Sequence, residues 1–236
     1  MFNASAEYYD LIYAAFKDYA AEVLQVSSLL RRLNPDCRTV LDVGCGTGEH
    51  ARLLTDHGFA VDGIDIEPAF VRIASAKNRS GRFVVADMSD FQLPTRYDAV
   101  LCLFSSIGYL RTLERVTRAL ACFRDHLAPD GVALVEPWFP PGVLEANREF
   151  VHSGEAHGVR VSRHSRTEIN GTLSRLLFEY EIDDHGEVRR VSEVHELGLF
   201  TTEEMRQAFA AAGLHVDHDP EGLTGRGLFI ARCAQV

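Results

Sequence analysis

Residues 40–50, VLDVGCGTGEH, decide the fold of this chain. An apolar run typical of a buried strand leads into glycines at positions 44, 46 and 48, and a helix starts directly after them. Glycine permits positive φ and lets a ligand touch the backbone, while a helix N-terminus offers free N–H groups. The GxGxG spacing differs from the GxGxxG of dinucleotide-binding loops, and the Gly-Lys-Ser/Thr of a P-loop is missing. The stretch predicts a ligand-binding turn in an α/β protein, with a purely structural turn as the alternative.

Strands and helices alternate around this turn. Strands are predicted at 38–43, 59–65, 82–88, 97–104 and 132–137. Helices are predicted at 20–33, 50–58, 68–78 and within 111–127, with a further helix at 201–213 and final strands at 214–219 and 227–235. Such alternation favours a mainly parallel sheet covered by helices on both faces. We expect a Rossmann-like, seven-stranded α/β fold.

The rhythm changes after residue 142. Partial polar–apolar alternation, broken by the turn signals HG, NG and DHG, predicts three or four antiparallel strands. We expect a small antiparallel sheet inserted into the main fold. The predicted division is a core formed by residues 1–142 and 201–236, and a substrate-binding lid formed by residues 143–200.

Composition narrows the possible partners. The net charge of −10 disfavours a nucleic-acid partner, and the sequence lacks an apolar run of the ~18 residues that a membrane helix needs. Five scattered cysteines and no secretion signal favour reduced thiols in the cytoplasm and no metal site. Residues 160–175 hold four arginines and one acid, which indicates either a solvated face or a site for a small anion. We expect a monomer or homodimer.

Acids end the next two predicted strands. Asp65 lies 17 residues after Gly48, where a carboxylate can accept both ribose hydroxyls of a cofactor. Asp87 and Met88 end the following strand, and a turn or helix-capping role is the alternative for Asp87. With the GxGxG turn, these acids resemble the motifs of class I S-adenosylmethionine (SAM) methyltransferases. In those enzymes the second acid meets the adenine amino group and its apolar neighbour packs on the ring.

Polar and aromatic side chains follow the fourth and fifth predicted strands, in LFSSIGYL (103–110) and EPWFPPG (136–142). Ligands of open α/β sheets bind beyond the carboxyl ends of the strands. Ser105, Ser106 and Tyr109 are therefore candidate contacts to a polar substrate. Helix capping for the serines, and a packed ring with a satisfied hydroxyl for Tyr109, are the alternatives.

A more specific resemblance covers nearly the whole chain. The segments YYDLIY, KDY, LDVGCGTGEH, ADM, FSSIGYL, EPWFPP, RVSRHSR, LFT and GRGLF occur in this order. Together they resemble the TDP-amino-sugar N-methyltransferases and N,N-dimethyltransferases of antibiotic biosynthesis. The resemblance implies a class I core with an antiparallel lid, SAM as methyl donor and S-adenosylhomocysteine as product. The implied acceptor is the amino group of a TDP-linked deoxysugar, methylated once or twice.

The resemblance also implies roles for individual residues. The expected cofactor-binding residues are Tyr9, Tyr19, Gly44, Cys45, Gly46, Gly48, Asp65, Ile66, Asp87, Met88 and Leu103. The expected substrate-binding residues are Ser106, Trp138, Ser162, Arg163, His164, Ser165, Arg166 and Arg226, with Arg226 at the pyrophosphate. The chain departs from the family in its short segment before Tyr9 and in WFPP where relatives have WWFPE. These departures leave open which amino sugar is used and whether its amine is at C3 or C4.

Methyl transfer to an amine requires a neutral nitrogen aligned with the methyl carbon. The candidate proton acceptors are Tyr109, Glu136 and His195. The sequence has no HxxH pair or carboxylate dyad that marks a dedicated base, so we hypothesise catalysis by positioning with weak acid–base help. The alternatives are another small amine or hydroxyl substrate, an NAD-dependent oxidoreductase, which the glycine spacing disfavours, and a non-catalytic SAM-binding scaffold.

Overall fold

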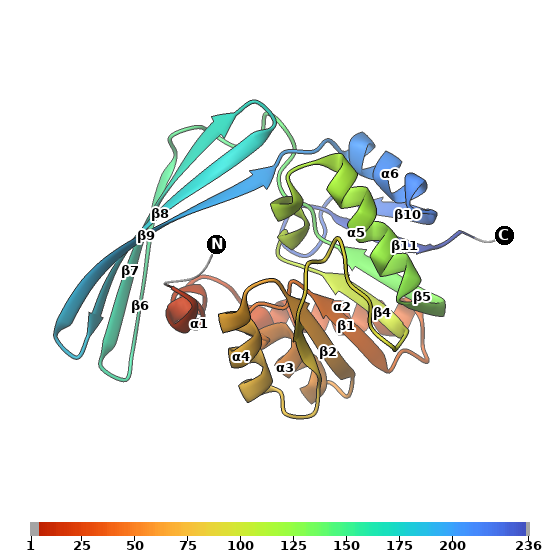
Figure 1. Cartoon of the computed structure of the whole chain (residues 1–236), viewed down its shortest axis with the longest axis horizontal. Coiled ribbons are helices and arrows are strands. Elements are labelled where there is room, and N and C mark those ends of the chain that lie inside the picture. Colours follow the sequence, from red (N-terminus) through yellow and green to blue (C-terminus); the bar gives the residue numbers. More distant parts are fainter. Residues whose placement is uncertain (1–4, 235–236) are drawn as a thin grey trace.

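The computed structural model describes residues 5–234 and contains a seven-stranded sheet (Figure 1). The strand order is β10-β11-β5-β4-β1-β2-β3. The strands are β1 (Thr39–Val43), β2 (Ala60–Asp65), β3 (Phe83–Val85), β4 (Tyr97–Cys102), β5 (Leu127–Val135), β10 (Leu214–Asp219) and β11 (Leu228–Cys233). Within this sheet β11 pairs antiparallel with both β5 and β10, and the other described pairs are parallel. The predicted Rossmann-like fold is confirmed.

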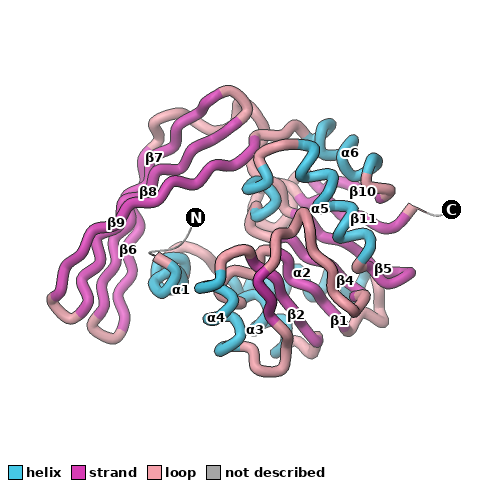
Figure 2. The backbone as a smooth tube through the Cα atoms, viewed as in Figure 1, coloured by secondary structure: helices cyan, strands magenta, loops and turns pink. Residues whose placement is uncertain are grey.

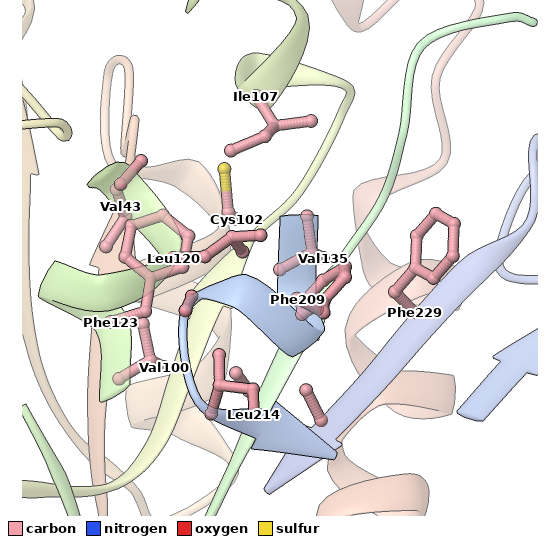
Figure 3. Close-up of a cluster of buried hydrophobic side chains, with 14 of the residues drawn as sticks. Val43, Val100, Cys102, Ile107, Leu120, Phe123, Val135, Phe209, Leu214 and Phe229 are labelled. Carbon is pink, nitrogen blue, oxygen red and sulfur yellow. The ribbon is translucent and has the colours of Figure 1, made fainter. Parts of the chain in front are cut away.

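Helices cover both faces of this sheet, as predicted. They are α2 (Tyr19–Leu33), α3 (Glu49–Asp56), α4 (Pro68–Lys77), α5 (Leu113–Asp125) and α6 (Thr202–Ala211). Consecutive strand residues point to opposite faces. Leu41 and Val43 therefore belong to one buried cluster with Phe123 of α5 and Phe209 of α6. Figure 3 shows Val43, Phe123 and Phe209 in this cluster. Val40 packs on the other face with Leu30 of α2 and with α3. Both faces of the central strands are buried, which explains their continuous apolar runs.

Element boundaries differ from the predictions by a few residues. β3 ends at Val85, before Asp87 and Met88, so these two residues lie in the loop after the strand. β5 begins at Leu127, five residues before the predicted start, and includes Pro129-Asp130-Gly131, where the β4–β5 register is irregular. β11 ends at Cys233, and residue 235 of the predicted strand lies outside the described residues.

A second, four-stranded antiparallel sheet stands apart from the first, with strand order β6-β7-β8-β9 (Figure 2). Its strands are β6 (Glu149–Ala156), β7 (Val159–Asn170), β8 (Leu173–Asp184) and β9 (Glu187–Gly198). Both residues of the His157-Gly158 and His185-Gly186 turns have positive φ, as tight hairpin turns require. The predicted antiparallel insertion is confirmed with four strands. We call this sheet the lid; that residues 143–200 form a separate domain stays a prediction.

Two short N-terminal helices, η1 (Ala6–Tyr8) and α1 (Tyr9–Tyr13), connect the lid to the core. Ser5 donates its backbone N–H and its hydroxyl to Glu193 of β9, at 3.2 and 2.9 Å. Asp10 accepts hydrogen bonds from Thr47 of the glycine turn and from Lys77 of α4. The N-terminal segment was predicted as part of the core, and it contacts the lid as much as the core. None of the helices within residues 5–234 is long and apolar enough to span a membrane.

Candidate functional site

One cavity of about 890 Å³ lies between the carboxyl ends of the core strands and the lid. Its walls come from the glycine turn, the loops after β2 and β3, the short helix η2 (Ser106–Leu110), α1, the 138–148 segment and lid strands β7–β9. The cavity therefore occupies the edge at which open α/β sheets bind their ligands. It includes both the predicted cofactor end and the predicted acceptor end.

The glycines of the turn serve three different purposes. Gly44 has φ +71°, and a Cβ there would lie 2.8 Å from the Cβ of Ser106, so glycine lets η2 pack on the turn. Gly46 has φ +53° and no atom within 4 Å of such a Cβ, so its backbone is open to close approach by a ligand. Gly48 caps α3 and lies against Ala74 of α4.

The carboxylate of Asp65 is held at the end of β2. It accepts the backbone N–H groups of Gly46 and Glu67, each at 2.9 Å. Burial raises the pKa of Asp65 above its usual value. Ile66 follows on the same cavity wall and is partly exposed. A hydrogen-bond acceptor beside an apolar surface suits a ribose attached to a flat ring.

Asp87 has the turn role that the sequence left as an alternative, and it also lines the cavity. One oxygen accepts the N–H and the hydroxyl of Ser89, both at 2.8 Å, and the other accepts Arg115 of α5 at 2.6 Å. Met88 lines the cavity beside it. Arg115 was not predicted, because its pairing with Asp87 depends on how α5 packs.

Some of the other residues predicted to bind the cofactor line the cavity, and others lie behind its wall. Tyr9 lines the cavity and stacks on Tyr13 at 4.1 Å between ring centroids. Tyr19 lies behind it and shares a hydrogen bond with Tyr9. Three more predicted residues are absent from the cavity lining and support the wall from behind, namely Cys45, Gly48 and Leu103. Leu103 belongs to the buried cluster under α2 and α3, and its role in cofactor binding stays a prediction.

The predicted acceptor end of the cavity is lined by Ser106, Tyr109, Trp138 and Arg226, and their contact with a substrate stays a prediction. Trp138 is fixed because its indole N–H donates to Ser174 of β8 at 2.8 Å. The Arg226 guanidinium lies over the rings of Phe104 and Trp138, at 5.0 and 5.8 Å from their centroids. This end of the cavity combines flat apolar walls with a cation.

Glu136 does not reach the cavity. Its side chain is fully buried, accepts the N–H of Phe104 at 2.6 Å and the hydroxyl of Thr224, and lies 3.9 Å from Arg226. These donors surround the carboxylate behind the cavity wall. In this structure Glu136 anchors the loops that form the wall, and its part in proton transfer stays a prediction.

The predicted Arg-rich segment on β7 splits by strand alternation. Arg163 and Ser165 line the cavity, whereas Ser162, His164 and Arg166 face away from it. Each outward residue has a partner outside the cavity, namely Ser153 for Ser162, Glu149 for His164 and Glu168 for Arg166. The substrate role of these three residues stays a prediction.

Arg163 is almost completely buried, at 4% exposure. Its guanidinium lies 4.5 Å from the ring centroid of Phe178 and 5.0 Å from that of Tyr13. The Nε and Nη1 groups have no protein partner. A buried cation with unpaired donors on a cavity wall is costly unless a ligand completes its hydrogen bonds. Neither Tyr13 nor Phe178 was predicted from the sequence. The available signal for Phe178 is the alternation of apolar residues at 178, 180 and 182 of β8, which is typical of a strand with one buried face.

Tyr109 and His195 are brought together across the cavity wall. The Tyr109 hydroxyl lies 3.1 Å from Nδ1 of His195, and Nε2 of His195 lies 3.3 Å from Glu193. Glu193 was not predicted. Its position two residues before His195 on β9 was the available signal, because residues i and i+2 share a strand face.

Comparison with known proteins agrees with this site. A methyltransferase-domain family model matches residues 40–131. The chain is 39% identical over 227 residues to the dTDP-3-amino-3,6-dideoxy-alpha-D-glucopyranose N,N-dimethyltransferase of Streptomyces fradiae, covering 95% of this chain and 89% of that protein. It is 34% identical to a dTDP-4-amino-2,3,4,6-tetradeoxy-D-glucose N,N-dimethyltransferase of Saccharopolyspora spinosa, covering 95% and 91%. The crystal structure of Streptomyces venezuelae DesVI superposes with a TM-score of 0.92 at 36% identity, covering 97% and 98%.

The fold, the open glycine turn and the two acids on its cavity wall define a class I SAM-dependent methyltransferase. Solved neighbours include the SAM-bound amino pentose methyltransferase CalS10 from Micromonospora echinaspora, with a TM-score of 0.84, 34% identity and coverage of 94% and 95%. The chain belongs to the family of TDP-amino-sugar N,N-dimethyltransferases. Its cofactor is SAM.

Asp42 is a buried acid directly before the glycine turn, and one of its oxygens has no hydrogen-bond partner. Burial, opposed by His50 and reinforced by Asp65, raises the pKa of Asp42 to about 6. The folded chain therefore holds this proton more tightly than the unfolded chain, where an aspartate titrates near ~3.9. The resulting stabilisation is complete below about pH 4 and is lost as the pH rises through about 6.

We expect Asp42→Asn to stabilise the cofactor-free protein at pH 8, on the order of 2 kcal/mol, because the amide removes the cost of a buried charge. The gain should shrink toward zero at pH 4. Urea unfolding of the variant and the wild type at both pH values measures the difference. A variant equally destabilised at both pH values would show that charge burial at Asp42 is not the cause.

Proposed function

We propose that the protein transfers methyl groups from SAM to the amino group of a TDP-linked amino deoxysugar in antibiotic biosynthesis, and does so twice. The observation that carries this proposal is the single cavity joining the open glycine turn to the buried, partly unpaired Arg163. The names of the relatives from Streptomyces fradiae and Saccharopolyspora spinosa support the substrate class and the two methylations.

The residues at the core end of the cavity fit SAM. The backbone of Gly46 admits close approach, Asp65 presents carboxylate oxygens for the ribose, and Asp87 with Met88 lies where the adenine is expected. When bound, SAM supplies a methyl group on a sulfonium, which is an excellent leaving group. The protein therefore has to place the amine rather than activate the donor, and such positioning supplies up to ~7 to 11 kcal/mol.

The lid end of the cavity fits a nucleotide diphosphate. Arg163 and Arg226 bring guanidinium groups to the wall of a protein whose net charge is −10, so the positive charge is local. Guanidinium groups match phosphate oxygens geometrically and lose less hydration energy than an ammonium. Trp138 and Phe139 add flat apolar surfaces for a base or a deoxysugar.

Aromatic side chains restrict water at the acceptor end. Tyr13, Phe104, Trp138 and Phe178 surround the two arginines and pack against one another or against the lid. A neutral amine in such surroundings loses less solvation than an ammonium, so the site favours the reactive form. We propose further that the enzyme works in the cytoplasm as a monomer or homodimer on this small-molecule substrate.

The direct test is mass spectrometry of reactions with SAM and a panel of TDP-3-amino and TDP-4-amino deoxyhexoses. We expect a mass increase of two methyl groups on at least one sugar. Free amino acids and simple amines, added in parallel, are the control acceptors. Turnover of a free amine with no turnover of any TDP-sugar would contradict the proposal.

Arg163→Met should raise the KM for the TDP-sugar at least about tenfold, because a charge-assisted hydrogen bond contributes ~1.5 to 3 kcal/mol. The affinity for S-adenosylhomocysteine should change less than about threefold. Arg160→Met is the matched control, because Arg160 is on the same strand, is exposed and pairs with Glu155. Titration calorimetry with TDP and S-adenosylhomocysteine measures both affinities. If the two variants weaken TDP binding equally, Arg163 does not bind the substrate diphosphate.

A further inference from the structure

Three side chains form a continuous hydrogen-bonded chain that begins at the cavity and ends in the lid. The hydroxyl of Tyr109 on η2 lies 3.1 Å from His195 Nδ1, and His195 Nε2 lies 3.3 Å from Glu193 Oε2. Tyr109 and His195 line the cavity, while Glu193 is buried behind them. The three groups come from two elements that are distant in sequence.

Glu193 is fixed in place by the N-terminal segment. Its two oxygens accept the backbone N–H of Ser5 at 3.2 Å and the Ser5 hydroxyl at 2.9 Å. A carboxylate oxygen that accepts from Nε2 sets the tautomer of His195, with the proton on Nε2 and the lone pair on Nδ1. The lone pair on Nδ1 then accepts the Tyr109 hydroxyl. The Tyr109 oxygen keeps lone pairs to accept a hydrogen bond from a group in the cavity.

We propose that Tyr109, His195 and Glu193 form a proton relay that takes one proton from the acceptor's ammonium group before each methyl transfer. This inference rests on the proposed function. An N–H bond of the ammonium breaks and an O–H bond forms at Tyr109. The original Tyr109 O–H bond breaks and its proton binds His195 Nδ1. The imidazolium formed is stabilised by the Glu193 carboxylate, and the amine keeps the electron pair that attacks the methyl carbon. When the product leaves, His195 returns its proton through Tyr109 to water, which restores the relay for the next transfer.

The electrostatic surroundings agree with these roles. Burial lowers the pKa of His195 below its usual value, so the ring is neutral and able to accept a proton near pH 7. Burial raises the pKa of Tyr109, so Tyr109 keeps a proton and acts by exchanging one proton for another. Within residues 5–234, the charged and titratable groups facing the pair from other elements include Tyr9 and Tyr13 of α1, Asp65 of β2, Arg163 of β7 and Tyr180 of β8. Tyr109 is the catalytic residue here, and His195 and Glu193 act through it.

The test is the pH profile of single-turnover methyl transfer to a TDP-amino sugar at saturating substrate. We expect the wild-type rate to be nearly constant from pH 7 to 9. His195→Asn keeps a hydrogen-bond acceptor near Nδ1 but takes no proton. Its rate should fall about 10²-fold at pH 7, the lower end of the general-base range, and recover to within about threefold at pH 9, where the amine arrives neutral.

Two further variants keep the test decisive if His195→Asn folds poorly. Tyr109→Phe should show the same pH-dependent loss, because it cuts the same path, and Glu193→Gln should show a smaller loss at pH 7. His215→Gln on the exposed edge strand β10 is the control and should keep the wild-type profile. KM should change little in any variant.

A second readout does not depend on turnover. The ¹⁵N chemical shifts of labelled histidine in the complex with S-adenosylhomocysteine should report the Nε2–H tautomer for His195. An Nδ1–H tautomer would overturn the relay, and so would a loss of rate that is the same at pH 7 and pH 9. If the wild type methylates amino sugars but the variants have pH profiles parallel to the wild-type profile, the relay is refuted and the proposed function is not. Failure of the wild type to methylate any amino sugar refutes the proposed function.

Discussion

The cavity depends on the buried carboxylate of Glu136. Directly after β5, it binds the backbone N–H of Phe104 after β4 and the hydroxyl of Thr224 before β11, with Arg226 nearby. An unpaired carboxylate at this depth costs several kcal/mol, so its donors must stay in place. Phe104 adopts positive φ under this constraint and lies between the cations of Lys17 and Arg226. Contacts within the protein therefore hold the wall of the proposed acceptor end in place.

The lid contributes the other wall of the cavity, and Arg163 is its main polar group there. Arg163 keeps unpaired donors only because Tyr13 and Phe178 shield and support its guanidinium. The N-terminal segment contacts both the lid and the glycine turn, through Ser5 and Asp10. An acidic protein can thus hold an anionic substrate, because its positive charge is concentrated where water is scarce.

The sequence predicts the core well because its signals are local. The apolar strands, the glycine turn and the positions of Asp65 and Asp87 all follow from spacing. The site is less predictable where contacts are distant: Glu136 reads as a candidate base, yet its partner Thr224 is 88 residues away. Alternation on β7 separates Arg163 from Arg166, but the sequence does not say which face meets the cavity. Arg115 and Glu193 depend on packing between elements, which no short motif encodes.

We propose that one cavity holds the cofactor and the amine, with Tyr109 beside the reacting nitrogen. A crystal structure with S-adenosylhomocysteine and the TDP-amino sugar would test this arrangement. We expect the diphosphate on Arg163 or Arg226, and the amine nitrogen within hydrogen-bond distance of the Tyr109 hydroxyl and facing the cofactor sulfur. An amine held away from Tyr109, or a nucleotide bound outside the lid, would contradict it.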